Sequence, residues 1–290
     1  VEDHFDAIRG NHPDTTALAR HDAITAFFSW LIDNRQRLRD KHDIDIDRSD
    51  NPAKGLLEGY ANINFTAKKA QVYGEDIIAL TREEATKLTA DENIPTPFTR
   101  NKLLIKLLLQ TGVRASEVTT IRCDDINRDE RRIRVRDAKH DRRRTVFYQP
   151  SLNRLLQKWL DGGLRETYAY ASSSEYLLPT SKSESLSYTA IRRIVDTAAQ
   201  NAGIQEKLYE DASGTPRWKV TPHTLRHTYA RFAVTGENRN GEKQLDVSRL
   251  AELMGHQDKE GNPNVTTTKK YLAFREEDLR EGSRACIPDI

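Results

Sequence analysis

Apolar residues recur at helical spacing in several separated segments of the chain. The strongest pattern is RNKLLIKLLLQTG at 100–112, which predicts a helix buried on almost all sides that ends at Gly112. At 15–36 a weaker pattern predicts one or two amphipathic helices, followed by an Asp-rich loop at 40–55. Three further helices are predicted at 151–160, 187–203 and 246–256.

A different period marks the only predicted strands. Residues 131–137 and 143–148 alternate around a charged turn, which is typical of a β-hairpin. Thr81 and Glu84 have the spacing of a capping box and predict the start of a helix. The predicted fold is therefore mainly α with a small β-sheet (α+β): a small helical piece at 1–66, a linker at 67–80, and a larger, mostly helical domain at 81–290.

The composition indicates a globular protein but does not by itself identify a partner. Hydrophobic residues make up 37% and charged residues 31% of the 290 positions, and no apolar run reaches the roughly 20 residues that a membrane span needs. Cys123 and Cys286 lack metal-ligand spacing and are expected to be reduced thiols. The net charge is only +2, but residues 128–144 hold nine basic and four acidic side chains. Such a patch fits a polyanionic partner or a solvated hairpin equally well.

The stretch TPHTLRHTYA combines two histidines and an arginine at the start of a predicted helix. Thr221 can cap this helix, and His223 and Arg226 then share one face near its N-terminus. A helix N-terminus with these side chains suits a phosphate group. His223 and His227 are also spaced for a metal, although no third ligand follows. An ordinary helix start, a phosphate site and a metal site all remain open from this stretch alone.

Four other segments contain residues that could take part in chemistry. Arg114 directly follows the buried helix, and Glu117 lies three residues further on, where it can hold the guanidinium. Lys139 lies in the turn of the basic hairpin. His256 follows a predicted helix C-cap, and Tyr271 lies in the stretch VTTTKKYLAF. Read singly, these could equally be a surface ion pair, a solvated loop residue and a packed tyrosine.

Read together, the segments resemble the tyrosine recombinase family, the phage-integrase and Xer-type enzymes. That family has an arginine in TGxRxSE, a hairpin lysine, HxLRH, LGH and a tyrosine, in this order. The resemblance spans about residues 81–275, and identifies 1–66 as part of a helical core-binding, DNA-binding domain. One departure is the 15-residue step from His256 to Tyr271, where KEGNPN is predicted to be a loop insertion. The matching positions are Arg114, Lys139, His223, Arg226, His256 and Tyr271.

The resemblance implies site-specific DNA recombination, or integration, through a covalent intermediate. Tyr271 would attack a backbone phosphate, giving a 3′-phosphotyrosyl bond and a free 5′-hydroxyl, with no metal, cofactor or ATP. Arg114 and Arg226 would clamp the phosphate oxygens, with Glu117 in support. His223 would act as the base or hydrogen-bond partner of the attacking oxygen. His256 would donate to the phosphate, and Lys139 would protonate the leaving oxygen.

The resemblance also implies partners. These are double-stranded DNA with specific recombination sites, contacted at its phosphates by Arg142, Arg143 and Arg144, and three further copies of the chain in a synaptic homotetramer. An accessory DNA-bending protein is a further possible partner, and no membrane is involved. The expected location is the cytoplasm, with the nucleoid, of a prokaryotic cell, or of one carrying the virus, plasmid or other mobile element that encodes it.

Three alternatives compete with this interpretation. A type IB topoisomerase would use the same residue types to relax DNA without sequence preference. A DNA-binding protein with the same fold could have lost catalysis, although candidates for all six positions are present. A metal hydrolase built from His21, Asp22 and His223 would need distant residues that no spacing connects.

Overall fold

The computed structural model describes residues 14–47, 49–53, 77–137, 142–210, 216–236, 245–258 and 261–274. The chain forms two units, Val1–Asp76 with Leu208–Arg217, and Ile77–Lys207 with Trp218–Ile290. None of the helices within the described ranges is long and apolar enough to cross a membrane.

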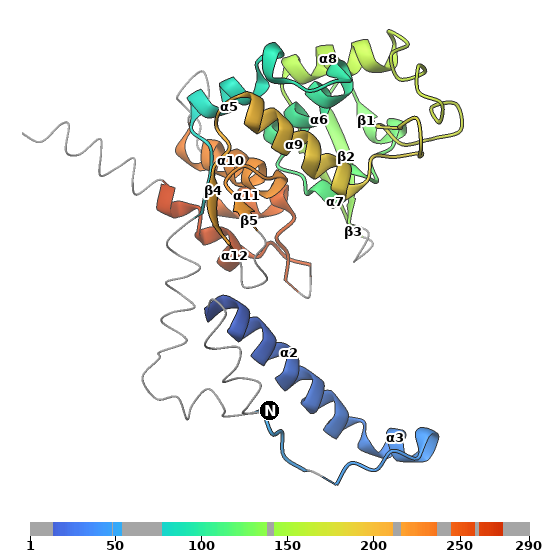
Figure 1. The fold of residues 1–290 in the computed structure, drawn as a ribbon, viewed down its shortest axis with the longest axis vertical. Helices are drawn as coiled ribbons and strands as arrows, with labels where there is room; N and C mark the ends of the chain where they lie inside the picture. The colour runs from blue at the N-terminus through green and yellow to red at the C-terminus, as the bar shows by residue number, and fades with distance from the viewer. Residues whose placement is uncertain are drawn as a thin grey trace, which may run out of the picture. The chain divides into compact units, whose positions relative to one another are not determined.

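The first unit contains the two helices expected near the N-terminus, α2 (Asp14–Asp33) and α3 (Arg35–His42) (Figure 1). The segment after α3 is a loop, as its composition predicts, and it returns to α2. The Asn51 side-chain amide donates to the Thr25 carbonyl at 2.7 Å, and His21 Nε2 lies 3.1 Å from the Ala53 carbonyl. These bonds join α2 to the loop.

Helix α6 (Phe98–Thr111) is the centre of the second unit, because its apolar positions surround its axis. Leu103, Leu104, Leu107 and Leu108 are fully buried, and burying one leucine contributes about 1.5–3 kcal/mol. The predicted capping box at Thr81 and Glu84 is confirmed. The helices that pack around α6 are α5 (Arg82–Thr89), α8 (Pro150–Leu160), α9 (Tyr188–Asn201) and α10 (Pro222–Thr235) (Figure 1).

The predicted hairpin is confirmed as β2 (Arg132–Asp137) and β3 (Arg142–Phe147). A short strand, β1 (Ile126–Asn127), which the sequence pattern did not predict, adds to β2 and gives the antiparallel order β1-β2-β3. A second sheet of two strands, β4 (Lys207–Glu210) and β5 (Pro216–Trp218), was also not predicted. The fold is mainly α with small sheets, as expected.

The second unit also contains several short elements. They are η1 (Asp91–Asn93), α7 (Ala115–Val118), η2 (Cys123–Asp125), α11 (Val247–Met254) and α12 (Val265–Lys269). Helix α11 packs against α10, α12 and β3, so the end of α11 lies where three elements meet. The predicted helix ends at Gly112 and Gly255 are confirmed, because both glycines adopt the left-handed conformation, with φ of 62° and 64°.

Candidate active site

Arg114 is placed by the abrupt end of α6. Gly112 reverses the chain direction, and Arg114 becomes the residue that caps α7. The Glu117 carboxylate accepts the Arg114 backbone N–H at 2.6 Å and its Nη1 at 3.0 Å, so Glu117 holds the guanidinium as its spacing predicts. The Arg114 side chain is still 39% exposed and can reach a ligand.

Arg144 also binds Glu117, from β3. Its Nη1 and Nη2 each donate to a Glu117 carboxylate oxygen at 2.7 Å, and its Nε donates to the Leu253 carbonyl at 2.9 Å. The side chain is only 8% exposed. Since all three guanidinium nitrogens have protein acceptors, this arrangement does not fit the prediction that Arg144 contacts DNA phosphates.

Glu117 is therefore a buried carboxylate shared by two guanidinium groups. Its side chain is 5% exposed and accepts four hydrogen bonds, two from Arg114 and two from Arg144. Burial alone would raise the pKa of Glu117, but hydrogen bonding and charge from Arg144, together with Arg114, keep that pKa below its usual value. Glu117 is thus an anion that fixes two cations.

Arg226 is the most deeply buried of the three arginines. Thr221 caps α10 and Pro222 occupies its first turn, as predicted, and this places Arg226, 2% exposed, on the inner face of the helix. Its Nη1 donates to the Gly112 carbonyl and its Nη2 to the Met254 carbonyl.

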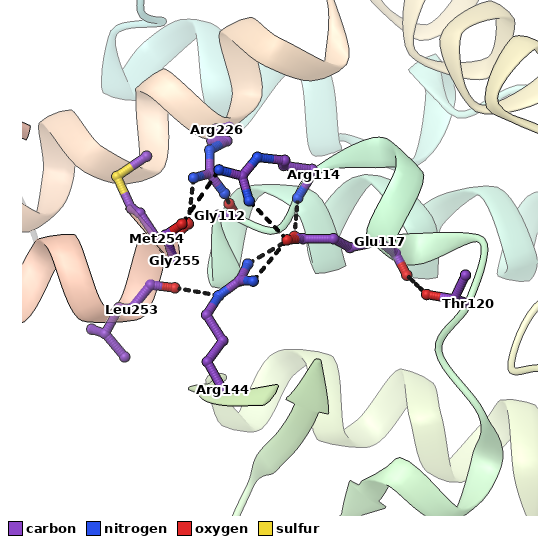
Figure 2. Close-up of polar contacts among 9 residues, drawn as sticks. All are labelled: Gly112, Arg114, Glu117, Thr120, Arg144, Arg226, Leu253, Met254 and Gly255. Carbon is purple, nitrogen blue, oxygen red and sulfur yellow. Dashed lines mark hydrogen bonds and ion pairs between the residues drawn. The ribbon is translucent and has the colours of Figure 1, made fainter. Parts of the chain in front are cut away.

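The end of α11 receives one guanidinium on each of three consecutive carbonyls (Figure 2). The carbonyl groups at a helix C-terminus lack helical partners and carry partial negative charge, so they suit cations. We call Arg114, Arg144, Arg226 and Glu117 the guanidinium cluster. The three acceptors are Leu253, Met254 and Gly255, the last at 3.4 Å from Arg114 Nη2.

The guanidinium cluster has three positive charges and one negative charge. Desolvation of Arg226, together with the charge of Arg114, lowers the pKa of Arg226 to about 9, so it remains protonated at neutral pH. Desolvation is the largest cause of this shift, and the charges of Arg114 and Arg144 add to it, whereas Glu117 acts in the opposite direction. The cluster is therefore suited to an anion.

Tyr271 lies in a mostly apolar pocket beside these arginines. It is 1% exposed and packs with Ala230, Leu250 and Met254. Its hydroxyl shares a 2.8 Å hydrogen bond with Nδ1 of His227. Burial raises the pKa of Tyr271 to about 12, although the charges of Arg226 and Arg114 act in the opposite direction. The phenol is therefore neutral in this structure.

His256 occupies the other side of this pocket. Its ring lies nearly parallel to that of Tyr271, with centroids 6.4 Å apart, and its Nδ1 is 2.8 Å from the Thr268 hydroxyl. Burial, followed by the charges of Arg226 and Arg114, lowers the pKa of His256 to about 3. We call His227, His256, Thr268 and Tyr271 the tyrosine pocket.

His223 and the hairpin residues are the remaining members of the predicted site. His223 is exposed, one turn before His227, with ring centroids 4.2 Å apart. Partial burial of its ring and the charges of Arg226, Lys270 and Arg114 lower its pKa. Arg143 is exposed on β3. Lys139 and the side chain of Arg142 lie outside the described residues.

The predicted insertion does not displace Tyr271 from the site. Gln257 and Pro263 pair as an antiparallel bridge, and the Asn264 N–H donates to the His256 carbonyl at 2.6 Å. Residues 257 and 263 are therefore neighbours in space. Asn264 then caps α12, at whose end Tyr271 lies.

Sequence reasoning missed two roles. His227 was considered only as a metal ligand, whereas it contacts the Tyr271 hydroxyl; among the described residues no three His, Cys, Asp or Glu side chains gather as a metal site. Arg144 was grouped with its surface neighbours. The strand alternation was the available signal, because Arg144 is two residues from buried Val146 and therefore shares its inward face.

Comparisons with known proteins are consistent with this geometry. The tyrosine recombinase XerA of Pyrococcus furiosus is 30% identical over 206 residues, which cover 70% of this chain and 59% of XerA. XerA of Saccharolobus solfataricus is 29% identical over 182 residues, covering 63% and 48%. The chain thus spans about half to three-fifths of the length of these curated relatives.

Solved structures share the fold. The crystal structure of XerA recombinase aligns with a TM-score of 0.56 at 20% identity, over 99% of this chain and 97% of that one. The Tn1549 transposon integrase, in complex with transposon right end DNA, aligns with a TM-score of 0.60 at 14% identity, over 97% and 83%. Residues 79–277 match the sequence model of the phage integrase family, and the chain belongs to that family.

Proposed function

We propose that this protein is a tyrosine-type DNA strand transferase, a site-specific recombinase or integrase. The observation that supports this most strongly is the meeting of a buried phenol with a cationic cluster. Tyr271 lies close enough to Arg226 and Arg114 for their charges to act on its pKa. Curated relatives of the chain are tyrosine recombinases, and a related integrase fold is solved with DNA.

The guanidinium cluster would stabilise the charge that develops on a phosphate during attack. Arg114 and Arg226 present planar forks that match phosphate oxygens, and their positions are fixed before the reaction. The net positive charge of the cluster is then balanced by the phosphate. Oxygen–phosphorus bond formation at Tyr271 would break the bond to the 5′-oxygen, leaving a 3′-phosphotyrosyl bond and a free 5′-hydroxyl.

Proton transfer would involve histidines and the hairpin lysine. Attack releases the phenol proton. His223 would act as the base that accepts this proton, or as a hydrogen-bond partner of the attacking oxygen. Lys139 would protonate the leaving 5′-oxygen. His256 would donate to the phosphate, whose negative charge favours the protonated imidazole and so raises the pKa of His256 on binding. Arg142 and Arg143 would contact DNA phosphates.

The proposed partners are double-stranded DNA with defined sites and other copies of this chain. Strand exchange between two duplexes needs four active sites, which a synaptic tetramer supplies, with an accessory DNA-bending protein as a further partner. The proposed setting is the nucleoid in the cytoplasm of a prokaryotic cell. Residues 1–66 would serve as part of the core-binding domain, joined through 67–80 to the catalytic domain at 81–290.

A covalent trapping experiment tests this function. The protein is incubated in EDTA with nicked fragments of the source genome, denatured, and assayed for protein-linked DNA, which is then sequenced. We expect an adduct with wild type and none with Tyr271→Phe. Tyr188→Phe, which alters an exposed tyrosine on α9, is the matched control and should retain the adduct.

The other outcomes identify the alternatives. An adduct that persists in Tyr271→Phe would assign the nucleophile elsewhere. DNA binding without any adduct would favour a non-catalytic DNA-binding protein. Relaxation of plasmids that lack the recovered site would favour a topoisomerase.

A further inference from the structure

Arg144 connects three elements of the catalytic unit. It begins on β3, binds both carboxylate oxygens of Glu117 in α7, and donates to the Leu253 carbonyl at the end of α11. Its guanidinium also lies against Gly255, where an added Cβ would come within 3.0 Å of Nη1. The residue that follows Gly255 is His256.

We propose that Arg144 is a positioning residue that acts through Glu117 to keep the charge of Arg114 available for phosphate. The inference rests on the proposed function, because it concerns the rate of phosphate cleavage. The Arg144 side chain is only 8% exposed, and each of its three nitrogens already donates to Glu117 or Leu253, so its role is to hold other groups.

The physical reason is the sharing of one carboxylate. Glu117 contacts Arg114 and Arg144 with similar N–O distances, 3.0 Å and 2.7 Å. Arg144 offsets the negative charge of Glu117, so Arg114 is held without being neutralised. Without Arg144, the buried carboxylate would have Arg114 as its only guanidinium partner in the cluster and would compete with phosphate for it.

The Arg144 side chain also fixes the orientation of the Glu117 carboxylate that holds Arg114. Two bonds to Glu117 and one to Leu253 hold the start of α7 against the end of α11. A lysine could supply the charge but not the planar fork that makes these three bonds together. Charge and shape therefore make separate contributions, which substitutions can distinguish.

The test is single-turnover cleavage of a duplex that carries the site recovered by trapping. A nick near the cleavage point releases a short strand and blocks religation. Three quantities are measured: the rate constant at saturating DNA, the fraction of protein that reacts, and the DNA affinity. Arg144→Met and Arg144→Lys are compared with Arg192→Met, which removes an exposed arginine on α9.

We expect Arg144→Met to lower the rate constant about 100-fold, the size of effect seen when one preorganised electrostatic group is lost. Arg144→Lys should fall between Arg144→Met and wild type. DNA affinity should change little in both. Arg192→Met should retain the rate constant, the reacting fraction and the DNA affinity, because Arg192 is exposed and lies outside the guanidinium cluster.

A purely structural role would give a different result. It would reduce the reacting fraction while the reacting molecules kept the wild-type rate constant, and this outcome would overturn the proposal, as would an unchanged rate constant in Arg144→Met. If Arg144→Met does not fold, the rate constant of Arg144→Lys decides, because an unchanged value there would equally overturn it.

A second-site variant tests the route through Glu117. Glu117→Gln removes the charge that competes for Arg114, so the double variant Arg144→Met/Glu117→Gln should cleave faster than Arg144→Met alone. A double variant slowed by the product of the single effects would reject action through Glu117. If wild type itself forms no adduct, the proposed function fails; if wild type reacts and Arg144→Met equals it, only this inference fails.

Discussion

The guanidinium cluster and the tyrosine pocket both contact the end of α11, but their polar groups are held in different ways. In the cluster, charged side chains bond to backbone carbonyls and to one shared carboxylate. In the pocket, a phenol packs among apolar side chains and bonds to a histidine whose pKa is lowered to about 3 by burial, then by His223, Lys270 and Arg226.

This difference separates two requirements of phosphoryl transfer. Phosphate binding needs positive charge that is fixed in advance, whereas a neutral phenol is a weak nucleophile that must lose its proton during attack. In the proposed reaction the cluster would provide this charge, and the burial of the pocket would keep Tyr271, the proposed nucleophile, protonated before attack. The shared α11 end explains how two such different environments can adjoin: its carbonyls bind the arginines, and the Met254 side chain packs in the pocket.

The largest effect is expected from breaking the cluster at Arg226. Arg226→Met removes a fixed fork and should lower the single-turnover cleavage rate constant about 10³-fold. The tyrosine pocket should persist, because the His227–Tyr271 bond does not include Arg226. Cleavage is measured on the duplex described above, and folding is checked by urea denaturation.

Arg192→Met is the matched control, because Arg192 is exposed on α9. It removes the same side chain from the same unit and should cleave at the wild-type rate. A rate constant for Arg226→Met within tenfold of wild type would show that the cluster does not act on the reacting phosphate.

A smaller effect should follow from displacing the cluster without removing any charge. Gly255→Ala places a Cβ 3.0 Å from Arg144 Nη1 and also adopts a left-handed φ, which costs a non-glycine residue about 1–2 kcal/mol. Gly163→Ala is the control, with φ of 70° and no atom within 4 Å of the added Cβ. Both should lose similar stability in urea melts, but only Gly255→Ala should lose about tenfold in cleavage rate, a modest loss of electrostatic preorganisation. Equal cleavage rates would indicate that the cluster tolerates the shift.

Local rules were sufficient for much of the fold. The apolar pattern of α6, the capping box at Thr81, the cap at Thr221 and the helix-ending glycines depend on residues within a few positions of one another, so the sequence predicts them. Strand β1 was missed because a two-residue strand shows no alternation, and it forms only by pairing Ile126 with Ile133.

In the candidate site, local rules predict contacts between near neighbours in the sequence but not contacts between distant residues. Arg114 and Glu117 are three residues apart, and their contact could be predicted. Arg144 bonds to Leu253, 109 positions away, and His227 to Tyr271, 44 positions away, and no local spacing indicates such pairs. The order of motifs indicated the family, but partners in the interior follow from tertiary packing.

The smallest expected effect concerns the pH dependence of the tyrosine pocket. The pKa of His227 is lowered to about 3 in the folded chain, whereas an unfolded histidine titrates near about 6.5. Between these values the unfolded chain binds a proton that the folded chain does not. Stability is therefore lost as pH falls below about 6.5, and His227 should contribute about 1 kcal/mol of loss between about pH 7 and 5.5.

Urea denaturation at both pH values measures this loss. His227→Asn cannot titrate and retains a polar atom near the position of Nδ1, so its stability should fall less steeply with acid than that of wild type. His42→Asn, on exposed α3 in the other unit, should retain the wild-type slope. Equal slopes for His227→Asn and wild type would mean that His227 is protonated in the folded chain. The tyrosine pocket would then be a second charged region, and the contrast with the guanidinium cluster would not hold.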